Sequence, residues 1–528
     1  MDGLRSLPAL LNRAAQRHPE RVALASDRLE LSYGQLSACA SRLAADFATA
    51  GLRPGDLVGL CVERGTLPLV LSAALMRAGC AYVALDMHHP PARLQHIVDS
   101  AGVRTVICDE PGEEALRPLA VSSLVIDLDD VRFAASQPPP SGRGPDVTPD
   151  MTAYVMFTSG SSGVPKGVPI THGNVVSLLQ DALPLFSYRD DEAWPLVHGY
   201  GFDVSVWEMW AGVAVGARLI ALDAAVSASP PRLAEALARY QPTRLHIVPS
   251  VFRHLADAVT AGSLKIQPRS VIFCGEAVNY RAIQTWSAGA PGPEPQWVNV
   301  YGITETTVYN TFHNLTPRET AAAPGATPIG RAYRRSPAAV LDADLRPARP
   351  GEPGEIFIGG LQVSPGYLGN PALTAERFQT IEGRAGRWYR TGDLGLMTDE
   401  GVLHYVGRAD DQVKVRGLRI ELGELDCALR QVPWIRDAAA IVEPTQQGDI
   451  NITACVELAD GAPAERSRFA ELRSALARVL PEYMLPASVV VLDRLPQNAN
   501  GKTNRRALAE AARTGRPVRA AEPAAGRG

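Results

Sequence analysis

The chain has 528 residues, of which 46% are hydrophobic and 20% charged, and its formal net charge is −4. This composition indicates a folded protein of several domains, and it excludes a disordered chain or a strongly basic one that binds nucleic acid or anionic membranes through its overall charge. The seven cysteines are scattered without a Cys-x-x-Cys pair, which argues against a zinc site or a disulfide framework and favours a reducing cytoplasm. No apolar run reaches the roughly 18 residues of a transmembrane helix, and the N-terminus does not begin a secretory signal.

From about residue 8 to residue 135, short apolar segments alternate with helical patterns. Residues 22–25, 57–61 and 81–85 are predicted strands, and residues 33–50 are predicted to form a helix with Ser32 as its N-cap. This alternation is typical of parallel sheets covered by helices. Residues 136–145, which are rich in proline and glycine, predict an exposed linker.

A loop rich in glycine and serine follows a predicted buried strand at residues 153–157. Its sequence is Thr158-Ser159-Gly160-Ser161-Ser162-Gly163-Val164-Pro165-Lys166-Gly167. Glycines make the backbone pliable, and closely spaced N–H and hydroxyl donors can surround phosphate oxygens. The loop is not a Walker A loop, because proline precedes its lysine and glycine follows it. A surface turn is the plain alternative.

The second half of the chain changes pattern twice. Alternation of strands and helices continues to about residue 330, and residues 347–405 carry short strands between Pro-Gly and Gly-Gly turns. From residue 411 the pattern is α+β, with a predicted helix at 469–480, and the tail predicts disorder. We predict an α/β fold with a large N-terminal domain of mixed and parallel sheets with helices plus a β subdomain, and a small α+β C-terminal domain. The predicted boundaries are 1–409, 410–512 and 513–528.

Four further segments carry polar residues that chemistry could use, although each has an ordinary structural explanation. The first, Asn299-Val300-Tyr301-Gly302-Ile303-Thr304-Glu305-Thr306, is compatible with a strand end and a capped helix start. Tyr389-Arg390-Thr391-Gly392-Asp393-Leu394 and Asn500-Gly501-Lys502 are compatible with turns. Gly407-Arg408-Ala409-Asp410, followed by residues 412–417, is compatible with an edge strand that carries solvated cations.

Together and in this order, these segments resemble the motifs of adenylate-forming enzymes, and most of all the amino-acid adenylation domains of nonribosomal peptide synthesis. Residues 31–36, 78–83, 202–205, 354–356 and 480–484 match as well, so the resemblance spans about residues 8–510. It implies an enzyme that joins a carboxylate to AMP at the expense of ATP and then passes the acyl group to a thiol. A carboxylate and ATP repel each other, so such an enzyme must neutralise charge and hold the reacting oxygen in line.

The resemblance implies a nucleotide site in which Lys502, Glu305 and Thr304 are the catalytic residues. Glu305 would bind Mg²⁺, Thr304 would contact a phosphate, and Lys502 would bridge the attacking carboxylate and the α-phosphate. The residues implied to hold the rest of ATP are Thr158, Ser159, Gly160, Ser161, Ser162, Gly163 and Lys166 at the phosphates, and Gly275, Glu276, Ala277, Asn299, Tyr301 and Gly302 around the adenine side. Asp393 would hold the ribose, and Arg408 would lie near the ribose or a phosphate.

Asp203 is the residue that most narrows the acid substrate. In the family this carboxylate pairs with an α-ammonium group, so the resemblance implies an α-amino acid; the plain alternative is a helix N-cap. The residues implied to line the side-chain pocket are Val204, Trp207, His246, Ile272, Cys274, Val300, Val308 and Tyr309. The set Asp-Val-Trp-His resembles serine-activating members, and the tyrosine at 309 removes volume, so serine is favoured, with alanine and glycine behind it. His246 has the alternative of a buried histidine bonded to backbone.

The resemblance also implies motion and partners. Asp410 matches the family's hinge, about which the C-terminal lid domain would rotate so that Lys502 leaves and a thiol enters past Gly417. About two dozen residues follow Lys502, too few for a carrier module, so we expect a free-standing enzyme that loads a separate peptidyl carrier protein. An MbtH-like helper protein is left open.

Two other functions stay open at the level of sequence. An acyl-CoA ligase of the same superfamily would transfer its product to coenzyme A, although such an enzyme has no evident use for Asp203. A catalytically silent binding protein with this fold would show no exchange activity, although Lys502, Glu305, Asp393 and the phosphate loop are all present.

Overall fold

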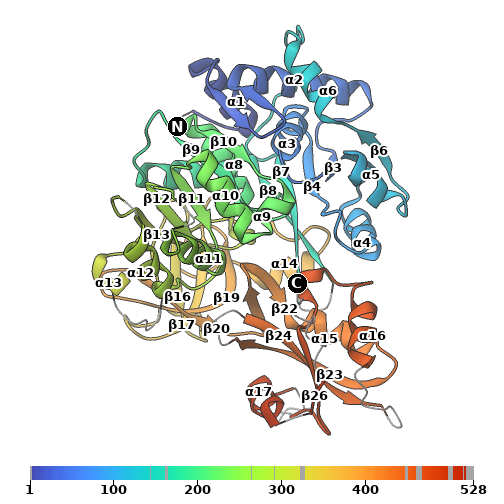
Figure 1. Cartoon of the computed structure of the whole chain (residues 1–528), viewed down its shortest axis with the longest axis vertical. Helices are drawn as coiled ribbons and strands as arrows, with labels where there is room; N and C mark the ends of the chain where they lie inside the picture. Colours follow the sequence, from blue (N-terminus) through green and yellow to red (C-terminus); the bar gives the residue numbers. More distant parts are fainter. Residues whose placement is uncertain are drawn as a thin grey trace. The chain divides into compact units, whose positions relative to one another are not determined.

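The computed structural model describes residues 3–142, 144–160, 164–262, 265–290, 292–321, 327–445, 450–459, 467–496, 503–514 and 516–518. The chain divides into two compact units (Figure 1). The first comprises Met1–Met87, Val98–Phe157 and Gly167–Ala409, and the second comprises His88–Ile97, Thr158–Lys166 and Asp410–Gly528. In none of the described ranges is a helix both long and apolar enough to cross a membrane.

A largely buried sheet forms the N-terminal part of the first unit. Its strands lie in the order β6 (Ser122–Val125), β5 (Thr105–Cys108), β3 (Leu57–Cys61), β4 (Ala81–Ala84), β7 (Thr152–Thr158) and β8 (Lys166–Thr171). The pairs from β6 to β7 are parallel. Every residue of β4 is buried, as expected for a parallel strand that is covered on both faces. A second sheet, in the order β2 (Glu30–Ser32), β1 (Val22–Ala25), β10 (Arg218–Ala221) and β9 (Ala193–Leu196), adjoins the same hydrophobic core.

A third sheet carries most of the predicted site residues. Its strands run in the order β11 (Arg244–Ile247), β12 (Ser270–Phe273), β13 (Gln296–Tyr301), β14 (Thr311–Asn314), β15 (Thr327–Ala332), β20 (Leu403–Arg408), β19 (Trp388–Met397), β17 (Gly354–Gly359) and β16 (Ala338–Leu341), with β18 (Phe378–Gln379) beside β19. The β-rich segment predicted as a β subdomain of the N-terminal domain continues this sheet through the β15–β20 pairing. Pairing between strands so distant in sequence leaves no local signal, which is why the sequence pattern could not show it.

Helices cover these sheets, and α2 packs against α3 and α6 (Figure 1). The helical segments of the first unit are α1 (Leu7–Arg17), α2 (Tyr33–Thr49), α3 (Leu67–Arg77), α5 (Glu110–Leu116), α6 (Leu128–Ser136), α7 (His172–Ala182), η1 (Leu183–Leu185), α8 (Val204–Val215), α9 (Ala224–Ser227), α10 (Pro230–Tyr240), α11 (Pro249–Thr260), α12 (Tyr280–Gly289), η2 (Thr304–Thr306), α13 (Pro317–Ala321) and α14 (Pro371–Arg377). Helix α4 (Pro91–Ala101) has residues in both units. The predicted cap of α2 is confirmed: Ser32 and Gln35 form a reciprocal capping box, which satisfies backbone donors that the first turn leaves unpaired.

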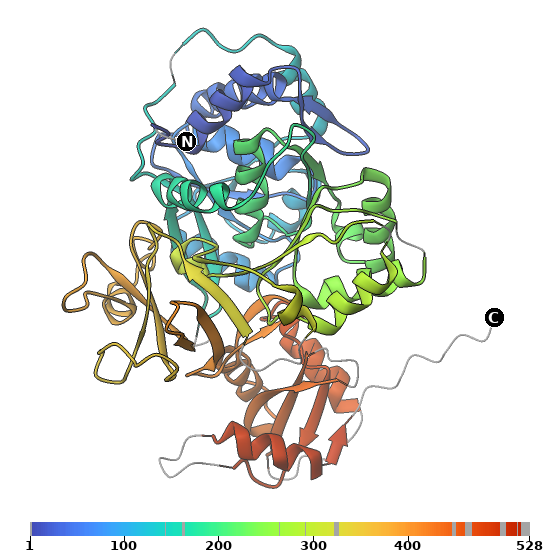
Figure 2. The same cartoon turned by 90° about the vertical axis from the view of Figure 1, so that its left-hand side faces the viewer.

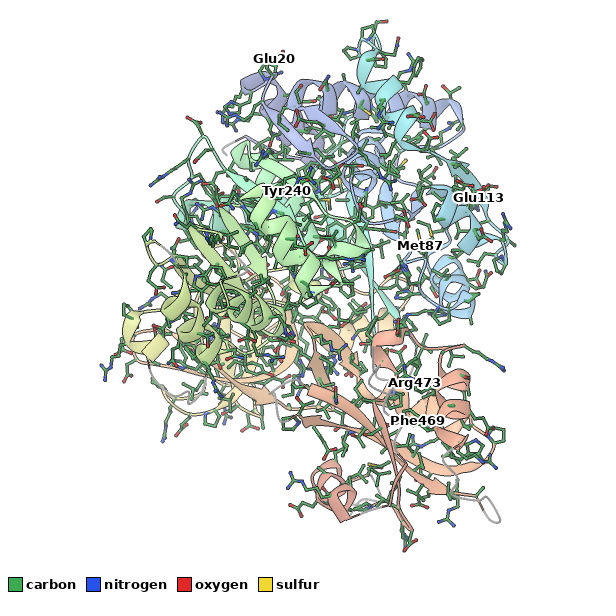
Figure 3. The ribbon with its side chains drawn as sticks, in the orientation of Figure 1. Glu20, Met87, Glu113, Tyr240, Phe469 and Arg473 are labelled. Carbon is green, nitrogen blue, oxygen red and sulfur yellow. The ribbon has the colours of Figure 1, made fainter. Side chains whose placement is uncertain are left out.

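The second unit is an α+β body (Figure 2). The hairpin of β21 (Gln412–Val415) and β22 (Leu418–Glu421) precedes a sheet in the order β23 (Ile435–Pro444), β24 (Ile450–Leu458), β25 (Ser488–Val491) and β26 (Arg516–Val518), and the helical segments are α15 (Leu422–Arg430), α16 (Ser467–Leu476), η3 (Glu482–Met484) and α17 (Arg505–Thr514). Both α15 and α17 contact β23. On α16, Phe469 lies in the core and Arg473, one turn later, donates to the Pro486 carbonyl (Figure 3).

Two predicted segments differ from the structure. The helix predicted at 469–480 begins at Ser467 and ends at Leu476, after which residues 477–479 form a turn. The first residues of the tail predicted to be disordered from residue 513 have regular secondary structure: α17 continues to Thr514, and β26 pairs antiparallel with β25. Residues 519–528 lie outside the described part of the chain. Alternating Arg, Pro and Val residues gave no apolar period from which this short edge strand could be predicted.

Candidate functional site

The sheet of β11, β12 and β13 separates two cores, and the predicted pocket residues lie on one of its faces. His246 is the register partner of Ile272, and Ile272 is the partner of Val298, so these side chains share a face. Cys274 and Val300 follow Ile272 and Val298 by two residues, and both belong to the core that includes α8. The residues between them, such as Leu245, Val271 and Phe273, belong to the other core. The alternation of the strands thus collects His246, Ile272, Cys274 and Val300 together.

Trp207 of α8 closes this face and bonds His246. Its indole Nε1 donates to Nε2 of the imidazole at 2.8 Å, and its ring meets the ring of Tyr309 edge to face at 5.5 Å. The proton of the imidazole is therefore on Nδ1, and among the described residues this buried Nδ1 has no hydrogen-bond partner. Burial lowers the pKa of His246 well below its ordinary value, and the charges of Arg244 and His198 act in the same direction. His246 is bonded to a side chain, not to backbone as in the plain alternative.

Asp203 precedes α8 without capping it. Its backbone is already helical, with φ −64° and ψ −23°, and its side chain makes no capping bond. The N-cap alternative is therefore wrong as an account of this carboxylate. Burial raises the pKa of Tyr309 well above its ordinary value, and the adjoining Cys274 and the charge of Asp203 raise it further. Trp207 contacts His246 and Tyr309, and Tyr309 lies near Cys274 and Asp203. We call these five residues, Asp203, Trp207, His246, Cys274 and Tyr309, the α8 cluster. Val204, the first residue of α8, packs against the same core.

Two residues beside this cluster were missed by the sequence reasoning. Nδ1 of His198 lies 2.7 Å from Oε1 of Glu208, whose side chain is completely buried in α8. Burial alone would lower the pKa of His198, but the Glu208 carboxylate outweighs it and, with a contribution from Cys274, raises the pKa to about 10. The sequence signal that could have found them is Glu208, the one acidic residue in the largely apolar helix α8. A buried carboxylate needs a partner, so this residue predicts a donor nearby.

A strained turn positions Val308 and Tyr309. Thr307 and Val308 have φ values of +63° and +65°, a left-handed conformation that β-branched residues rarely adopt. The surrounding structure enforces it: the Thr307 hydroxyl donates to the Gln362 carbonyl, and Asn310 bonds Thr306, Ser336 and Gln362. A Cβ on Gly302 would lie 2.0 Å from the Val308 carbonyl oxygen, so only glycine fits there.

The second set of predicted residues meets around Asp393, and we call Tyr301, Asp393 and Arg408 the Asp393 cluster. The fully buried Asp393 accepts a hydrogen bond from the Tyr301 hydroxyl at Oδ2 (2.5 Å) and one from Arg408 at Oδ1 (2.7 Å). Burial raises the pKa of Tyr301 well above its ordinary value, and the Asp393 charge adds to this. Neighbouring strands explain the assembly, because Asp393 on β19 is the register partner of Arg408 on β20.

The remaining nucleotide residues of the first unit have defined partners. Asn299 on β13 donates to the Pro328 carbonyl at 2.8 Å, so one of its amide hydrogens is already engaged. Glu305, in the η2 turn that Thr304 begins, is fully buried and accepts from the Tyr367 hydroxyl at 2.9 Å.

Glu276, in the run Gly275-Glu276-Ala277 after β12, accepts from the Ser250 amide at 2.9 Å.

The phosphate loop belongs to the second unit, where its described residues are Thr158, Ser159, Gly160 and Val164–Lys166. Ser159 Oγ donates to the Arg419 carbonyl at 3.0 Å and accepts from the Glu421 amide at 3.2 Å, so β22 engages this hydroxyl. The Thr158 hydroxyl is buried and has no partner among the described residues. A Cβ on Gly160 would meet the Val164 carbonyl oxygen at 2.0 Å, which explains the glycine where the loop folds back on itself.

Several predictions cannot be placed. Ser161, Ser162, Gly163 and Lys502 lie outside the described residues. The predicted hinge residue Asp410 begins the last segment of the second unit, and Gly417 lies in the turn of the β21–β22 hairpin with φ +77°.

The residues present are compatible with a nucleotide and its metal ion. A carboxylate has about four lone-pair positions, so Asp393 can accept ribose hydroxyls in addition to its two present donors. The unpartnered hydroxyl of Thr158 suits a phosphate oxygen. Within the described residues, no group of three or more His, Cys, Asp or Glu side chains could hold a metal ion by itself. Mg²⁺ commonly binds through one or two carboxylates together with phosphates, and the buried carboxylate of Glu305 could supply one such ligand.

A surface cavity of about 1070 Å³ in the first unit is separate from these clusters. Its lining includes Arg64, Asp223 and Tyr240, the last of which is labelled at the end of α10 in Figure 3. None of the predicted site residues lines it.

Comparison with known proteins places the chain in a family. Residues 11–368 match the family described as AMP-binding enzyme, and residues 424–502 match the AMP-binding enzyme C-terminal domain. A dimodular nonribosomal peptide synthase of Bacillus subtilis is 38% identical over 518 residues, which cover 95% of this chain but only 21% of the synthase. Syringomycin synthase SyrB1 of Pseudomonas syringae is 34% identical over 499 residues, which cover 94% of this chain and 80% of that protein.

A solved structure agrees with these sequence matches. It is the artificially fused adenylation–PCP di-domain NpsA-ThdA from Klebsiella oxytoca, which is 27% identical, covers 92% of this chain and 93% of that chain, and has a TM-score of 0.79. The chain thus belongs to the AMP-binding enzymes, as an adenylate-forming adenylation domain of the nonribosomal peptide synthetase type.

Proposed function

We propose that the protein uses ATP and Mg²⁺ to activate a small α-amino acid, with serine favoured over alanine and glycine, and then loads it onto the phosphopantetheine thiol of a carrier protein. The observation that carries this proposal is the α8 cluster. A carboxylate that is not used as a helix cap lies beside a set of aromatic and polar side chains on the face of a sheet. Asp203 supplies the opposite charge for an α-ammonium group, which a substrate without that group would not need.

The charges of the two substrates assign a role to each of the proposed site residues. In the first step a substrate carboxylate oxygen bonds to the α-phosphorus, and the bond to pyrophosphate breaks. Asp203 would hold the ammonium, and Asp393, fixed by Tyr301 and Arg408, would hold the ribose. Mg²⁺ held at Glu305 would neutralise phosphate charge. Lys502 would stabilise the charge that develops between the two reactants.

The second step requires a different arrangement of the lid. A thiol sulfur bonds to the acyl carbon, and AMP leaves with the electrons of the mixed-anhydride bond. We propose residues 1–409 as the adenylation core and 410–512 as the lid, with Asp410 as the hinge. The solved relative NpsA-ThdA joins an adenylation domain to a PCP domain, which supports a carrier protein as the acceptor. Cytoplasmic location is part of this proposal, whereas an MbtH-like partner is left open.

The size of the substrate follows from what surrounds Asp203. Trp207 and Tyr309 are both 2% exposed and their rings touch, so two of the largest side chains occupy the end of the cluster. His246 offers an N–H group there that has no partner within the described chain. A small side chain with a hydroxyl group satisfies both features, whereas a large apolar one satisfies neither.

The test is amino-acid-dependent exchange of pyrophosphate into ATP, measured with every proteinogenic amino acid and with aryl and fatty acids as a second panel. We expect serine to give the highest kcat/KM, and transfer to a phosphopantetheinylated carrier rather than to coenzyme A. Preference for an acid without an ammonium group, with transfer to coenzyme A, would establish the ligase alternative. Absence of exchange with every acid would establish a silent binding protein.

A further inference from the structure

Residues 364–367, between β17 and α14, hold Glu305 at two points and have no role in the reaction as proposed so far. The Ser364 amide donates to the Glu305 carbonyl at 2.9 Å, and the Tyr367 hydroxyl donates to Oε1 of the Glu305 carboxylate at the same distance. Glu305 lies in the η2 turn, 62 residues before Tyr367 in the chain. One segment thus fixes both the backbone and the side chain of the residue that we propose as the Mg²⁺ ligand.

A second buried phenol bonds the hydroxyl of Tyr367. The hydroxyl oxygens of Tyr367 and Tyr389 lie 2.9 Å apart. Because the single proton of the Tyr367 hydroxyl is directed to Glu305, Tyr389 is the donor in this pair. Protons are therefore donated in the order Tyr389 to Tyr367 to Glu305, and these residues are 1%, 5% and 0% exposed. Hydrogen bonds to a carboxylate are stronger in such a buried place than at the surface.

The packing around Tyr367 leaves its ring little freedom. Phe378 meets the Tyr367 ring edge to face at 5.3 Å and lies 4.8 Å from the Tyr389 ring. The Tyr367 amide donates to Oγ1 of Thr374 at 2.9 Å. Gly366 has φ +139°, and a Cβ there would lie 2.5 Å from the Thr374 side chain, so glycine is required at this turn. A phenol that cannot turn away holds the carboxylate in one orientation.

A neutral donor suits a carboxylate that must hold a cation. A phenol orients the carboxylate without adding a charge of its own, and a carboxylate has about four lone-pair positions, so one phenol does not exhaust them. A lysine or arginine in the same place would offset the charge that attracts the metal ion. Asp393 has the other arrangement, because Arg408 bonds a carboxylate that is proposed to hold uncharged ribose hydroxyls.

We propose that Tyr367 is a positioning residue that fixes the Glu305 carboxylate for Mg²⁺, with Tyr389 as the donor that orients the Tyr367 hydroxyl. The inference rests on the proposed function and deepens it, because it names the groups that set the metal affinity of the complex with ATP. Tyr367 acts through Glu305 and is not itself a metal ligand. Loss of an outer partner of a metal ligand typically lowers metal affinity by about 10- to 100-fold.

The experiment measures metal binding apart from activity. Mn²⁺, which suits the same oxygen ligands as Mg²⁺, is titrated into the full chain with an equimolar amount of α,β-methylene-ATP, and EPR reports the free ion. We expect Tyr367→Phe to bind Mn²⁺ about tenfold more weakly than the wild type, and Glu305→Gln to bind it more weakly still. Tyr33→Phe is the matched control and should bind as the wild type does, because this phenol is also buried but donates to the Ala217 carbonyl.

Pyrophosphate exchange gives a second readout that a purely structural role would not move. In Tyr367→Phe, the Mg²⁺ concentration for half-maximal exchange should rise about tenfold. The kcat value should return close to that of the wild type when Mg²⁺ is saturating, and KM for the amino acid should not change. Tyr389→Phe should give a smaller shift in the same direction, and it carries the test if Tyr367→Phe does not fold.

The outcomes separate the role of Tyr367 from the proposed function. An unchanged Mn²⁺ affinity in Tyr367→Phe, an equal loss in Tyr33→Phe, or a loss of exchange that saturating Mg²⁺ does not restore would each overturn the role of Tyr367. Wild-type affinity in Glu305→Gln would overturn it as well, because Glu305 would then not be a metal ligand. The Mn²⁺ titration uses no amino acid, so absence of all amino-acid-dependent exchange in the wild type would overturn the proposed function instead.

Discussion

The Asp393 cluster and the α8 cluster belong to the same unit but satisfy their polar groups differently. Asp393 already accepts from a phenol and a guanidinium, so its carboxylate is fixed before any ligand arrives. In the α8 cluster, by contrast, Nδ1 of His246 is buried without a partner in the described chain. A buried donor of this kind costs about 1–3 kcal/mol until something bonds it.

This difference suits two kinds of binding site, one for a constant ligand and one that selects among similar ligands. A site for a ligand that never changes gains from groups that are held rigidly by their neighbours, since little order is lost on binding. A site that must choose among similar ligands gains from groups whose satisfaction depends on the right ligand. The two clusters can therefore be perturbed separately, and five predictions test this, from the largest expected effect to the smallest.

Lys502→Ala should have the largest effect, because it disables the adenylation step, which needs both the Asp393 cluster and the α8 cluster. We expect ATP–pyrophosphate exchange to fall about 1000-fold, because the charge that develops between the two reactants loses its cation. Thioester formation from supplied aminoacyl-adenylate should be largely retained, since under the proposed scheme Lys502 has no part in that step. Equal loss of both steps in rapid-quench assays would refute the two-conformation scheme.

Asp203→Asn should disable the α8 cluster alone. Loss of the partner for an ammonium group costs about 3 kcal/mol, so KM for the amino acid should rise about 100-fold. KM for ATP should change less than about twofold, because the Asp393 cluster is untouched. Asp399→Asn, at an exposed turn, is the control. A parallel rise in both KM values would mean that Asp203 supports the fold rather than the substrate.

Asp393→Asn should raise KM for ATP and leave KM for the amino acid unchanged, the reverse of Asp203→Asn. The amide keeps the size of the side chain but loses the charge that faces Arg408, and we expect KM for ATP to rise about tenfold. KM for the amino acid should stay near its wild-type value. Asp344→Asn, which removes an exposed partner of Arg346, is the matched control. A larger effect on the amino acid than on ATP would show that the two clusters are not separable.

The protonation of His198 should appear in the pH dependence of stability. Its pKa is raised from 6.5 to about 10 in the folded chain, so the folded state holds the extra proton between these values. The stabilisation is complete below pH 6.5 and is lost as the pH rises toward 10, by about 1 kcal/mol for each pH unit in this range. Urea unfolding at several pH values should show this slope in the wild type and a flatter one in His198→Phe/Glu208→Met. Parallel slopes would contradict the raised pKa.

Trp207→Phe should have the mildest effect. It removes the bond from the indole to Nε2 of His246 and leaves a smaller ring against Tyr309, and we expect about a fivefold lower kcat/KM for the amino acid, with ATP parameters unchanged. Trp286→Phe, in the core on the other face of the sheet, is the control. The ¹⁵N spectrum of His246 should show loss of the fixed Nδ1–H tautomer. An unchanged spectrum would mean that the bond does not govern the imidazole.

Local patterns carried much of the fold and a large part of the site. Strand β3 and the capping box of α2 could be predicted because apolar runs and a Ser–Gln pair act within a few residues. The pocket residues could be named because each lies close to a recognisable motif, and strand alternation then brought Ile272, Cys274 and Val300 to one face.

What could not be predicted depends on long-range contacts. The continuation of the third sheet into β20 joins strands about 75 residues apart, and nothing nearby in sequence encodes it. The left-handed backbone at Val308 contradicts the preference of its own residue type. His198 and Glu208 were overlooked because a single histidine and a single glutamate are common, although a carboxylate among the apolar residues of α8 was a usable signal.

The turn at Thr307 and Val308 has a consequence for anyone who wishes to redesign the enzyme. Glycine adopts such a backbone without steric cost, and asparagine or aspartate does so more readily than valine, but each would remove the Val308 side chain, which is almost fully buried. Libraries randomised at residue 308 should therefore yield few folded members.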